Sequence, residues 1–307
     1  MNSLKLQWIW LIDLASNFRR HLLVVGMAIL AMGIALSMQI FLILASLITL
    51  MFAVLPLTSW LEKRTLLSAD ISRQFVITSF NIQWTTDNHV RSLAFIEQCQ
   101  ADVMVLQEVA AETRIIINSF RDRFPYQYGE GHNHVMIISR HELQFIEYVK
   151  WPGKFAERAL HVTCSIQDCL IHLFAIHLQN TLSWHEVERR NQQIDSLFDS
   201  IKNCKEAVMV IGDFNAATGS RVLRSIETKI DLKASSTLLN YRSTWPAKAG
   251  ILGIQLDHFF VSNDLIVLNQ QLGPKLDSDH RPITAVVYIS NDKFNHQWQN
   301  RMLRKSN

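Results

Sequence analysis

Cysteine is scarce in this chain of 307 residues: there are four, and none has the Cys-x-x-Cys spacing typical of zinc sites. Two of them, Cys164 and Cys169, flank the tetrapeptide Ser-Ile-Gln-Asp, which predicts a hairpin turn. Two interpretations stay open for this pair. They are small buried thiols on neighbouring strands, or they form a disulfide, which would place the domain in an oxidising compartment.

A surplus of basic residues is also missing. The formal net charge is +3, and the segment up to Ser59 carries three basic residues and one acidic residue, which leaves +1 for the rest. A nuclease that binds many phosphates without sequence preference usually carries a clear excess of basic over acidic residues. The composition therefore does not favour a general nuclease.

Charged residues are absent from Leu22 to Leu61, a stretch rich in Leu, Ile, Met, Ala and Val. One helix of this length would run about 60 Å, about twice the hydrocarbon core of a bilayer. The stretch is also too long for the apolar region of a signal peptide. We therefore predict a membrane anchor over residues 1–60, with transmembrane helices at 22–38 and 40–57 that form a hairpin.

The sequence after the anchor divides into three parts. Charges and serines return in residues 61–73, which predicts a linker. Residues 74–290 suffice for one large α/β domain with a substantial core. Residues 291–307 form a basic tail with aromatic residues at helical spacing, which predicts a solvated tail or, alternatively, a segment that lies on an anionic membrane surface.

Three short acidic signatures follow one another along the predicted domain: Gly-Asp-Phe-Asn at 212–215, Leu-Asp-His at 256–258 and Ser-Asp-His-Arg-Pro at 278–282. Glu108 lies upstream in Leu-Gln-Glu-Val. Mg²⁺ prefers oxygen ligands and keeps several waters, so Glu108 and Asp279 suit the role of metal ligands. The signatures therefore predict a site that binds a hard divalent cation.

The same signatures supply the other groups that cleavage of a phosphate ester requires, an activated water and donors to the phosphate oxygens. Asp213 can orient or deprotonate the water. Asn215 and a protonated His280 can donate to the phosphate, and Asp257 can keep His280 charged by pairing with it. Gly-Asp-Phe-Asn alone would more simply close a strand with an Asx turn, but the combination of motifs favours a catalytic site.

Apolar runs short enough for buried strands precede most of these polar residues. They are residues 75–80 before Asn81, 103–106 before Glu108, 170–177 ending at His177, and 206–211 before Gly212. In a layered α/β protein, sites are built at the ends of strands. His172 alternates with apolar neighbours and is interpreted as a strand-face residue, and His161 has no assigned role.

The motifs and their order resemble the endonuclease/exonuclease/phosphatase (DNase I-like) superfamily, in its membrane-anchored bacterial type. The resemblance covers about Gln74 to Tyr288. It implies a four-layer α/β sandwich, in which two packed mixed β-sheets are flanked by helices, here preceded by the transmembrane helical hairpin. Members of this superfamily include DNase I-like nucleases, sphingomyelinases and inositol-phosphate phosphatases.

The resemblance also implies roles for single residues. Glu108, Asp279 and Asn81 correspond to the metal site, and His177 and Asn180 to residues that contact the scissile phosphate. Asp213, Asn215, His280 and Asp257 correspond to the catalytic groups described above. Trp245 is interpreted either as a wall of the substrate pocket or as a plain packing residue.

We therefore predict a membrane-anchored hydrolase that uses Mg²⁺, or Mn²⁺ in its place, to cleave a phosphodiester by attack of an activated water. The expected partners are the lipid bilayer and a phosphate-ester substrate, either nucleic acid or phospholipid, and no obligate protein partner is indicated. The alternative is a non-catalytic membrane scaffold that retains the fold. The expected location is the cell membrane, the inner membrane in a bacterium, and the side that the domain faces stays open.

Overall fold

The computed structural model describes residues 14–36, 39–40, 42–50, 73–86, 88–129, 134–151, 159–181, 183–236 and 242–289. The helices are α2 (Arg19–Ala35), α4 (Val90–Gln98), α5 (Ala111–Asn118), α6 (Trp184–Ile201) and α7 (Arg221–Ile230), with the 3-10 helices η2 (Ser119–Asp122) and η4 (Ala247–Leu252). The strands are β1 (Gln74–Asn81), β2 (Val103–Val109), β3 (Tyr126–Tyr128), β4 (His134–Ser139), β5 (Leu143–Tyr148), β6 (Ala159–Ile166), β7 (Cys169–His177), β8 (Ala207–Asp213), β9 (Lys233–Ala234), β10 (Asp257–Val261), β11 (Leu265–Leu272) and β12 (Ile283–Ile289).

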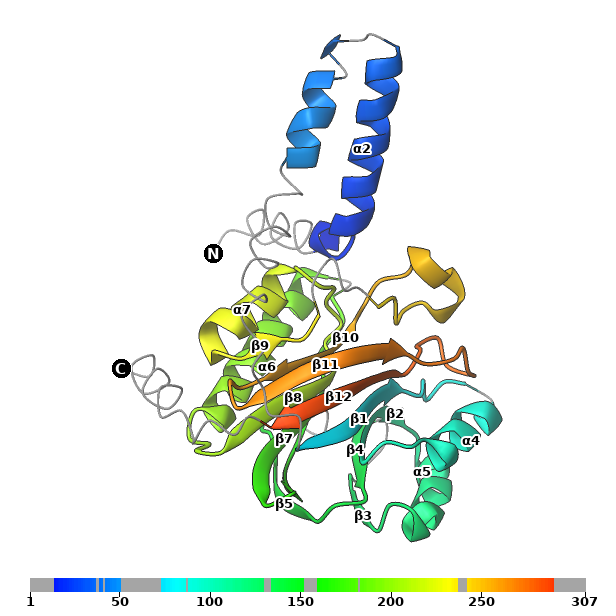
Figure 1. Ribbon diagram of the computed structural model, residues 1–307, viewed down its shortest axis with the longest axis vertical. Coiled ribbons are helices and arrows are strands. Elements are labelled where there is room, and N and C mark those ends of the chain that lie inside the picture. The colour runs from blue at the N-terminus through cyan, green and yellow to red at the C-terminus, as the bar shows by residue number, and fades with distance from the viewer. Residues whose placement is uncertain are drawn as a thin grey trace.

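Two six-stranded sheets pack face to face, and helices cover their outer faces (Figure 1). The first sheet has the order β11-β12-β1-β2-β4-β3 and the second has the order β5-β6-β7-β8-β10-β9. Each sheet is mixed because it contains one parallel pair, β1 with β2 and β7 with β8, among antiparallel neighbours. This arrangement confirms the predicted two-sheet sandwich.

Three hydrophobic cores account for the four layers. The central core joins the inner faces of both sheets, and it includes Ile77 and Val105 of the first and Leu173 and Ile211 of the second. Further cores lie under α6 and α7 and under α4 and α5. Because both faces of the middle strands are covered, every residue of β8 is buried, which is why its sequence reads as a continuous apolar run.

The turn between β6 and β7 is the hairpin that the sequence predicts. Gln167 and Asp168 have φ angles of 50° and 63°, as the two central residues of a type I′ turn require. Cys164 pairs with Ile171 and Cys169 with Ile166, so the two cysteines are not opposite one another. Both are free thiols, which agrees with the simpler of the two interpretations.

A helix pair precedes the sandwich and extends away from it along the long axis of the molecule (Figure 1). It consists of α2 and the helical residues 39–40 and 42–50. Residues 42–50 are helical and pack against α2, since a Cβ on Gly26 would lie 3.0 Å from Oγ1 of Thr49. The predicted spans 22–38 and 40–57 lie partly outside the described residues. Among the helices that the structure describes, none combines the length and apolar character needed to cross a bilayer, so the predicted transmembrane hairpin is not confirmed.

The start of α2 is tied to loops of the sandwich. The amide of Ala217 donates to Oδ1 of Asn17 at 2.9 Å, and Arg19 donates to the carbonyl of Gly219 at 2.8 Å. His21 Nε2 donates to the carbonyl of Leu252 at 2.8 Å. The base of the helix pair therefore lies against the loop that follows β8 and against η4. Predicted linker residues 61–72 and the basic tail 291–307 lie outside the described residues.

Candidate active site

The two parallel strand pairs bring the predicted site residues together. β1 ends at Asn81 and its neighbour β2 carries Glu108, while β7 ends at His177 and β8 at Asp213. His177 and Asp257 are both paired in register with Asp213. Parallel strands end at the same edge of a sheet, so the packing of the two sheets places these polar side chains at one edge of the sandwich.

Asn81 connects the two sheets at this edge. Its Nδ2 donates to Oε1 of Glu108 and to Oδ2 of Asp213, each at 3.1 Å. Nε2 of His177 lies 3.7 Å from the same two carboxylate oxygens. Four of the predicted residues thus form one contiguous cluster.

His280 completes the cluster from the loop between β11 and β12. Its Nδ1 lies 3.0 Å from Oδ2 of Asp257, and its Nε2 lies 3.7 Å from Oδ2 of Asp213. Burial alone would lower the pKa of His280, but the carboxylates of Asp257 and Asp213 outweigh it and raise this pKa to about 10. The two carboxylates therefore favour the imidazolium form of His280, the form that the predicted mechanism requires.

Asp213 is almost completely buried. Burial raises its pKa to about 7, and the nearby Asp257 adds to this effect, while His280 and the hydrogen bonds from Asn215 and Asn81 oppose it. A carboxylate with a pKa near neutral can accept a proton from water at physiological pH. The environment of Asp213 therefore suits a general base.

A glycine and a strained turn aim Asp213 into the site. Gly212 has a φ of 145°, and a Cβ there would lie 2.0 Å from the carbonyl oxygen of Ile176, so the close approach of β8 to β7 requires glycine. Asn215 has a φ of 47°, and its amide donates to Oδ1 of Asp213 at 2.8 Å. The Gly-Asp-Phe-Asn signature is thus both a strand-closing turn and part of the site.

The side chain of Asn215 has a positioning contact that the sequence does not predict. Its Nδ2 donates to the carbonyl of Leu178 at 2.8 Å. Fully buried Arg190 of α6 donates to the carbonyl of Asn215 at 3.1 Å and to Oγ1 of Thr181 at 3.4 Å. The loops after β7 and β8 are therefore held together beside Asp213.

Glu108 lies in an irregular stretch of β2. Its φ is 56°, and the register between β2 and β4 shifts between Leu106 and Val109. Strained residues in β-bulges often re-aim a side chain at a functional site. The side chain of Glu108 is 21% exposed, so this carboxylate is open to a ligand from solvent.

Asp279 and Trp245 interact with one another. Nε1 of Trp245 donates to Oδ2 of Asp279 at 2.9 Å, and the amide of Asp279 donates to Oε1 of Gln83 at 2.8 Å. Ser278 donates to the carbonyl of Asn81 at 2.6 Å, which ties this loop to β1. Trp245 therefore orients the carboxylate of Asp279. The sequence suggested either a pocket wall or a packing residue, and neither includes this contact.

Asn180 is a predicted site residue on the surface beside this network. It is exposed, and its Oδ1 accepts a hydrogen bond from its neighbour Gln179 at 2.9 Å. Within the part of the chain that the structure describes, no hydrogen bond joins Asn180 to the carboxylate and imidazole cluster. Its predicted contact with the phosphate stays a prediction.

Other residues of the site could not be found from the sequence. His258 follows Asp257 but faces away from the cluster, where its Nε2 donates to the carbonyl of Ala216 at 2.9 Å and its Nδ1 lies 3.0 Å from Oγ of Ser236. Burial lowers the pKa of His258 to about 4, so this imidazole is neutral and structural. Arg190 lies in a polar run of α6 and Gln83 lies in the loop after β1, so neither carried a sequence signal.

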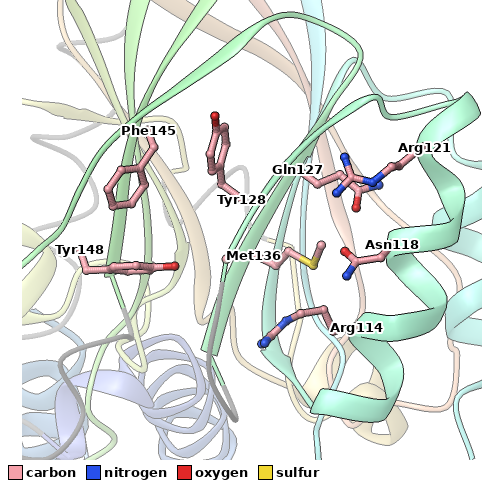
Figure 2. Close-up of a pocket in the computed structure, with 9 residues that line it drawn as sticks. Arg114, Asn118, Arg121, Gln127, Tyr128, Met136, Phe145 and Tyr148 are labelled. Carbon is pink, nitrogen blue, oxygen red and sulfur yellow. The ribbon is translucent and has the colours of Figure 1, made fainter.

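A cavity of about 660 Å³ lies elsewhere, between α5 and β5 (Figure 2). Arg114 and Asn118 of α5 and Arg121 of η2 line one side, and the rings of Tyr128, Phe145 and Tyr148 line the other. None of the predicted catalytic residues lines this cavity. The groups suited to bond cleavage therefore belong to the cluster at the strand ends.

The sequence profile of the Endonuclease/Exonuclease/phosphatase family matches residues 78–280, about two thirds of the chain. The chain belongs to this family. The match spans Asn81, Glu108, His177, Asp213 and His280, the residues that the strand ends bring together. No match was found among curated proteins.

Solved structures share the fold of this family member. An endonuclease/exonuclease/phosphatase from Beutenbergia cavernae has 16% identity and a TM-score of 0.56, covering 71% of this chain and 72% of its own. Truncated Caenorhabditis elegans TDP2 has 19% identity and a TM-score of 0.55, covering 70% and 97%. A mutant beta toxin from Staphylococcus aureus with bound magnesium ions has 18% identity and a TM-score of 0.55, covering 71% and 100%.

Proposed function

We propose that this protein is a divalent-metal-dependent phosphodiesterase that acts by attack of an activated water. One observation carries the proposal: contacts of 3.1 to 3.7 Å link Asn81, Glu108, His177, Asp213 and His280 into one cluster between the two sheets. Membership of a family named for enzymes that cleave phosphate esters supports it. A scaffold would gain nothing from three buried or half-buried carboxylates around two imidazoles.

The donor set at the edge of the first sheet fits a hard cation. Glu108 is an accessible carboxylate, and Asn81 holds it in place through Nδ2. We assign Glu108 as the principal ligand of Mg²⁺ or Mn²⁺, with Asp279 as a second carboxylate on the same side and Asn81 as the residue that orients Glu108. When bound there, the cation would neutralise charge on the phosphate oxygens.

The edge of the second sheet supplies the proton chemistry. Asp213 is the base that accepts a proton from the attacking water, because its pKa is about 7 and two hydrogen bonds fix its carboxylate. The imidazolium of His280 donates to a phosphate oxygen, and Asp257 maintains its charge. Nε2 of His177 lies at the same distance from both carboxylates and is a further donor to the phosphate.

We further propose that the helix pair attaches the enzyme to the cell membrane. Half of the large apolar side chains that are exposed in the described residues belong to this pair, among them Ile34, Ile40 and Leu47, each at least 60% exposed. An exposed apolar surface of this kind is typical of contact with a membrane or a partner. The adjacent η4 adds Ile251 and Leu252, which are 85% and 71% exposed.

The position of the helix pair favours a lipid headgroup as substrate. Asn17, Arg19 and His21 fix its base to the loop after β8 and to η4, and both segments border the site. The near-neutral charge of the domain also disfavours a long nucleic acid. Nucleic acid is the second candidate, because a similarly folded TDP2 from D. rerio is complexed with a single-strand DNA product.

The test is a hydrolysis panel with Mg²⁺ and with excess chelator. It compares a chromogenic phosphodiester, phospholipid vesicles, single-stranded DNA, abasic DNA and RNA. The proposal expects Mg²⁺-dependent release from the chromogenic substrate, with phospholipid preferred among the natural ones. Preference for DNA or RNA would overturn the lipid assignment alone, and no hydrolysis of any member would support the scaffold alternative.

A further inference from the structure

A second cluster of ligand-type side chains lies on the outer face of the second sheet, the face that α6 and α7 cover. His161 is on β6, His172 is near the start of β7, and Cys204 is in the turn between α6 and β8. One ligand atom of each lies within 4.8 Å of the other two. The catalytic residue His177 is five residues beyond His172 on β7, a distance of about 16 Å along a strand. The cluster is therefore separate from the active site.

Each imidazole of this cluster has a carboxylate near the ring nitrogen that faces away from the other ring. Nε2 of His161 and Nδ1 of His172 face one another at 2.8 Å. The far nitrogen of each ring faces a carboxylate: His172 Nε2 lies 3.0 Å from Glu206, and His161 Nδ1 lies 3.7 Å from Glu147. In metal-binding histidines, the ring nitrogen that does not bind the metal usually donates its N–H to a carboxylate, a carbonyl or a water.

The surroundings of the cluster suit a cation bound in a dry site. His161 is 4% exposed and its ring stacks on Phe174, so the position of this ring is fixed. Burial, and then the neighbouring His172, lower the pKa of His161 to about 3, which keeps the imidazole neutral and able to bind a metal. Burial raises the pKa of the Cys204 thiol, and the carboxylates of Glu206 and Glu147 raise it further. The negative potential of these two carboxylates also attracts a cation.

We propose that His161, His172 and Cys204 bind one divalent transition-metal ion, with Zn²⁺ as the ion best suited to two nitrogens and a sulfur. Mg²⁺ avoids sulfur and prefers oxygen, so this site and the active site select different metals. A water completes four-coordination.

Binding requires two proton shifts that the cluster can accommodate. The thiol proton of Cys204 leaves to solvent as the metal–sulfur bond forms. The proton shared between the two rings moves to Nδ1 of His161, which faces the carboxylate of Glu147, and this frees Nε2 of His161 and Nδ1 of His172 for the metal. The ion would tie β6 and β7 to the turn before β8.

The test is a titration of the full chain with Co²⁺, whose thiolate complexes show a charge-transfer band in the near ultraviolet. Because the active site offers only oxygen and nitrogen ligands, it cannot produce this band. We expect the band to saturate at about one Co²⁺ per chain and to be removed by Zn²⁺. Cys204→Ser should abolish it, and the control Cys169→Ser, on an adjacent half-buried thiol, should leave it unchanged.

A second variant covers the case in which Cys204→Ser fails to fold. Glu206→Gln, on a side chain that is 38% exposed, keeps all three ligands and removes only the carboxylate that orients His172. It should retain the band and weaken Co²⁺ affinity by about 10- to 100-fold, whereas the exposed control Glu188→Gln should not. A wild-type chain without the band, or a band that survives Cys204→Ser, would show that the cluster is only a buried polar network.

Discussion

The sandwich buries polar groups that usually face solvent, whereas the helix pair exposes apolar groups that are usually buried. In the sandwich, Asp213, Asp257 and His280 are charged or titratable groups that are buried. In the helix pair, Ile34 and Leu47 are large apolar groups that are exposed. Each departure costs stability in water, so each suits a partner that completes the structure. We propose a cation and a phosphate for the first and a bilayer for the second.

The largest expected effects concern the buried charges of Asp213 and His280. His280→Asn removes the imidazolium between Asp257 and Asp213, and it should lower kcat for a chromogenic phosphodiester by about 10²- to 10³-fold, as loss of one preorganised donor does. The exposed control His185→Asn on α6 should leave kcat within about twofold. A His280→Asn enzyme within tenfold of wild type would remove this residue from the mechanism.

The next effect separates metal binding from proton transfer. Glu108→Gln keeps the size of the side chain but removes the charge that faces the cation, so we expect about a 10²-fold loss of activity at a fixed Mg²⁺ concentration. Mg²⁺ should raise the melting temperature of wild type and not of this variant, because only a ligand that binds the native state stabilises it. An equal Mg²⁺ shift in both proteins would contradict the assignment of Glu108.

A pH profile tests the buried base without any mutation. Asp213 acts as a base only when deprotonated, so kcat/KM should fall about tenfold per pH unit as the pH drops below the pKa of about 7. The stabilisation that Asp213 gives to the folded state should instead decrease as the pH rises. Since the folded pKa exceeds the ordinary 3.8, this group stabilises the fold fully only below about pH 3.8, and the contribution is lost as pH rises towards 7. A flat profile between pH 5 and about 8 would exclude Asp213 as the base.

The smallest expected effect concerns the exposed apolar surface. Leu44→Glu together with Leu47→Glu places two charges on side chains that are 56% and 60% exposed. Binding to phospholipid vesicles should weaken by about tenfold, since the two charges replace apolar surface that the bilayer would bury. Hydrolysis of the soluble chromogenic substrate should not change. Unchanged vesicle binding would show that the helix pair serves another contact.

The sequence predicted the strands of the site because burial on both faces leaves a direct signature. The runs before Asn81, Glu108 and Gly212 are mostly apolar, and the structure shows them as β1, β2 and β8. The contact of Asn81 with Asp213 could not be derived in this way, because it joins two sheets across 132 residues of sequence. Only the packing of the sheets creates it.

Other features depend on local geometry that residue type does not encode. The positive φ of Glu108 arises from a register shift against β4, and a glutamate carries no sign of it. His161 and His172 alternate with apolar neighbours as ordinary strand residues do, and only the pairing of β6 with β7 shows that their rings meet. The helix signal of the amino-terminal run was clear, but its relation to a bilayer requires measurement.

The most direct test of the catalytic assignment compares Asp213→Asn with Asp199→Asn, a matched change on an exposed residue at the end of α6. Both purified chains would be assayed for Mg²⁺-dependent hydrolysis of a chromogenic phosphodiester, with the Mg²⁺ shift in melting temperature as a check on folding. The account predicts that Asp213→Asn loses about 10³-fold or more in kcat while the control retains full activity. Activity of a folded Asp213→Asn enzyme within tenfold of wild type would contradict it.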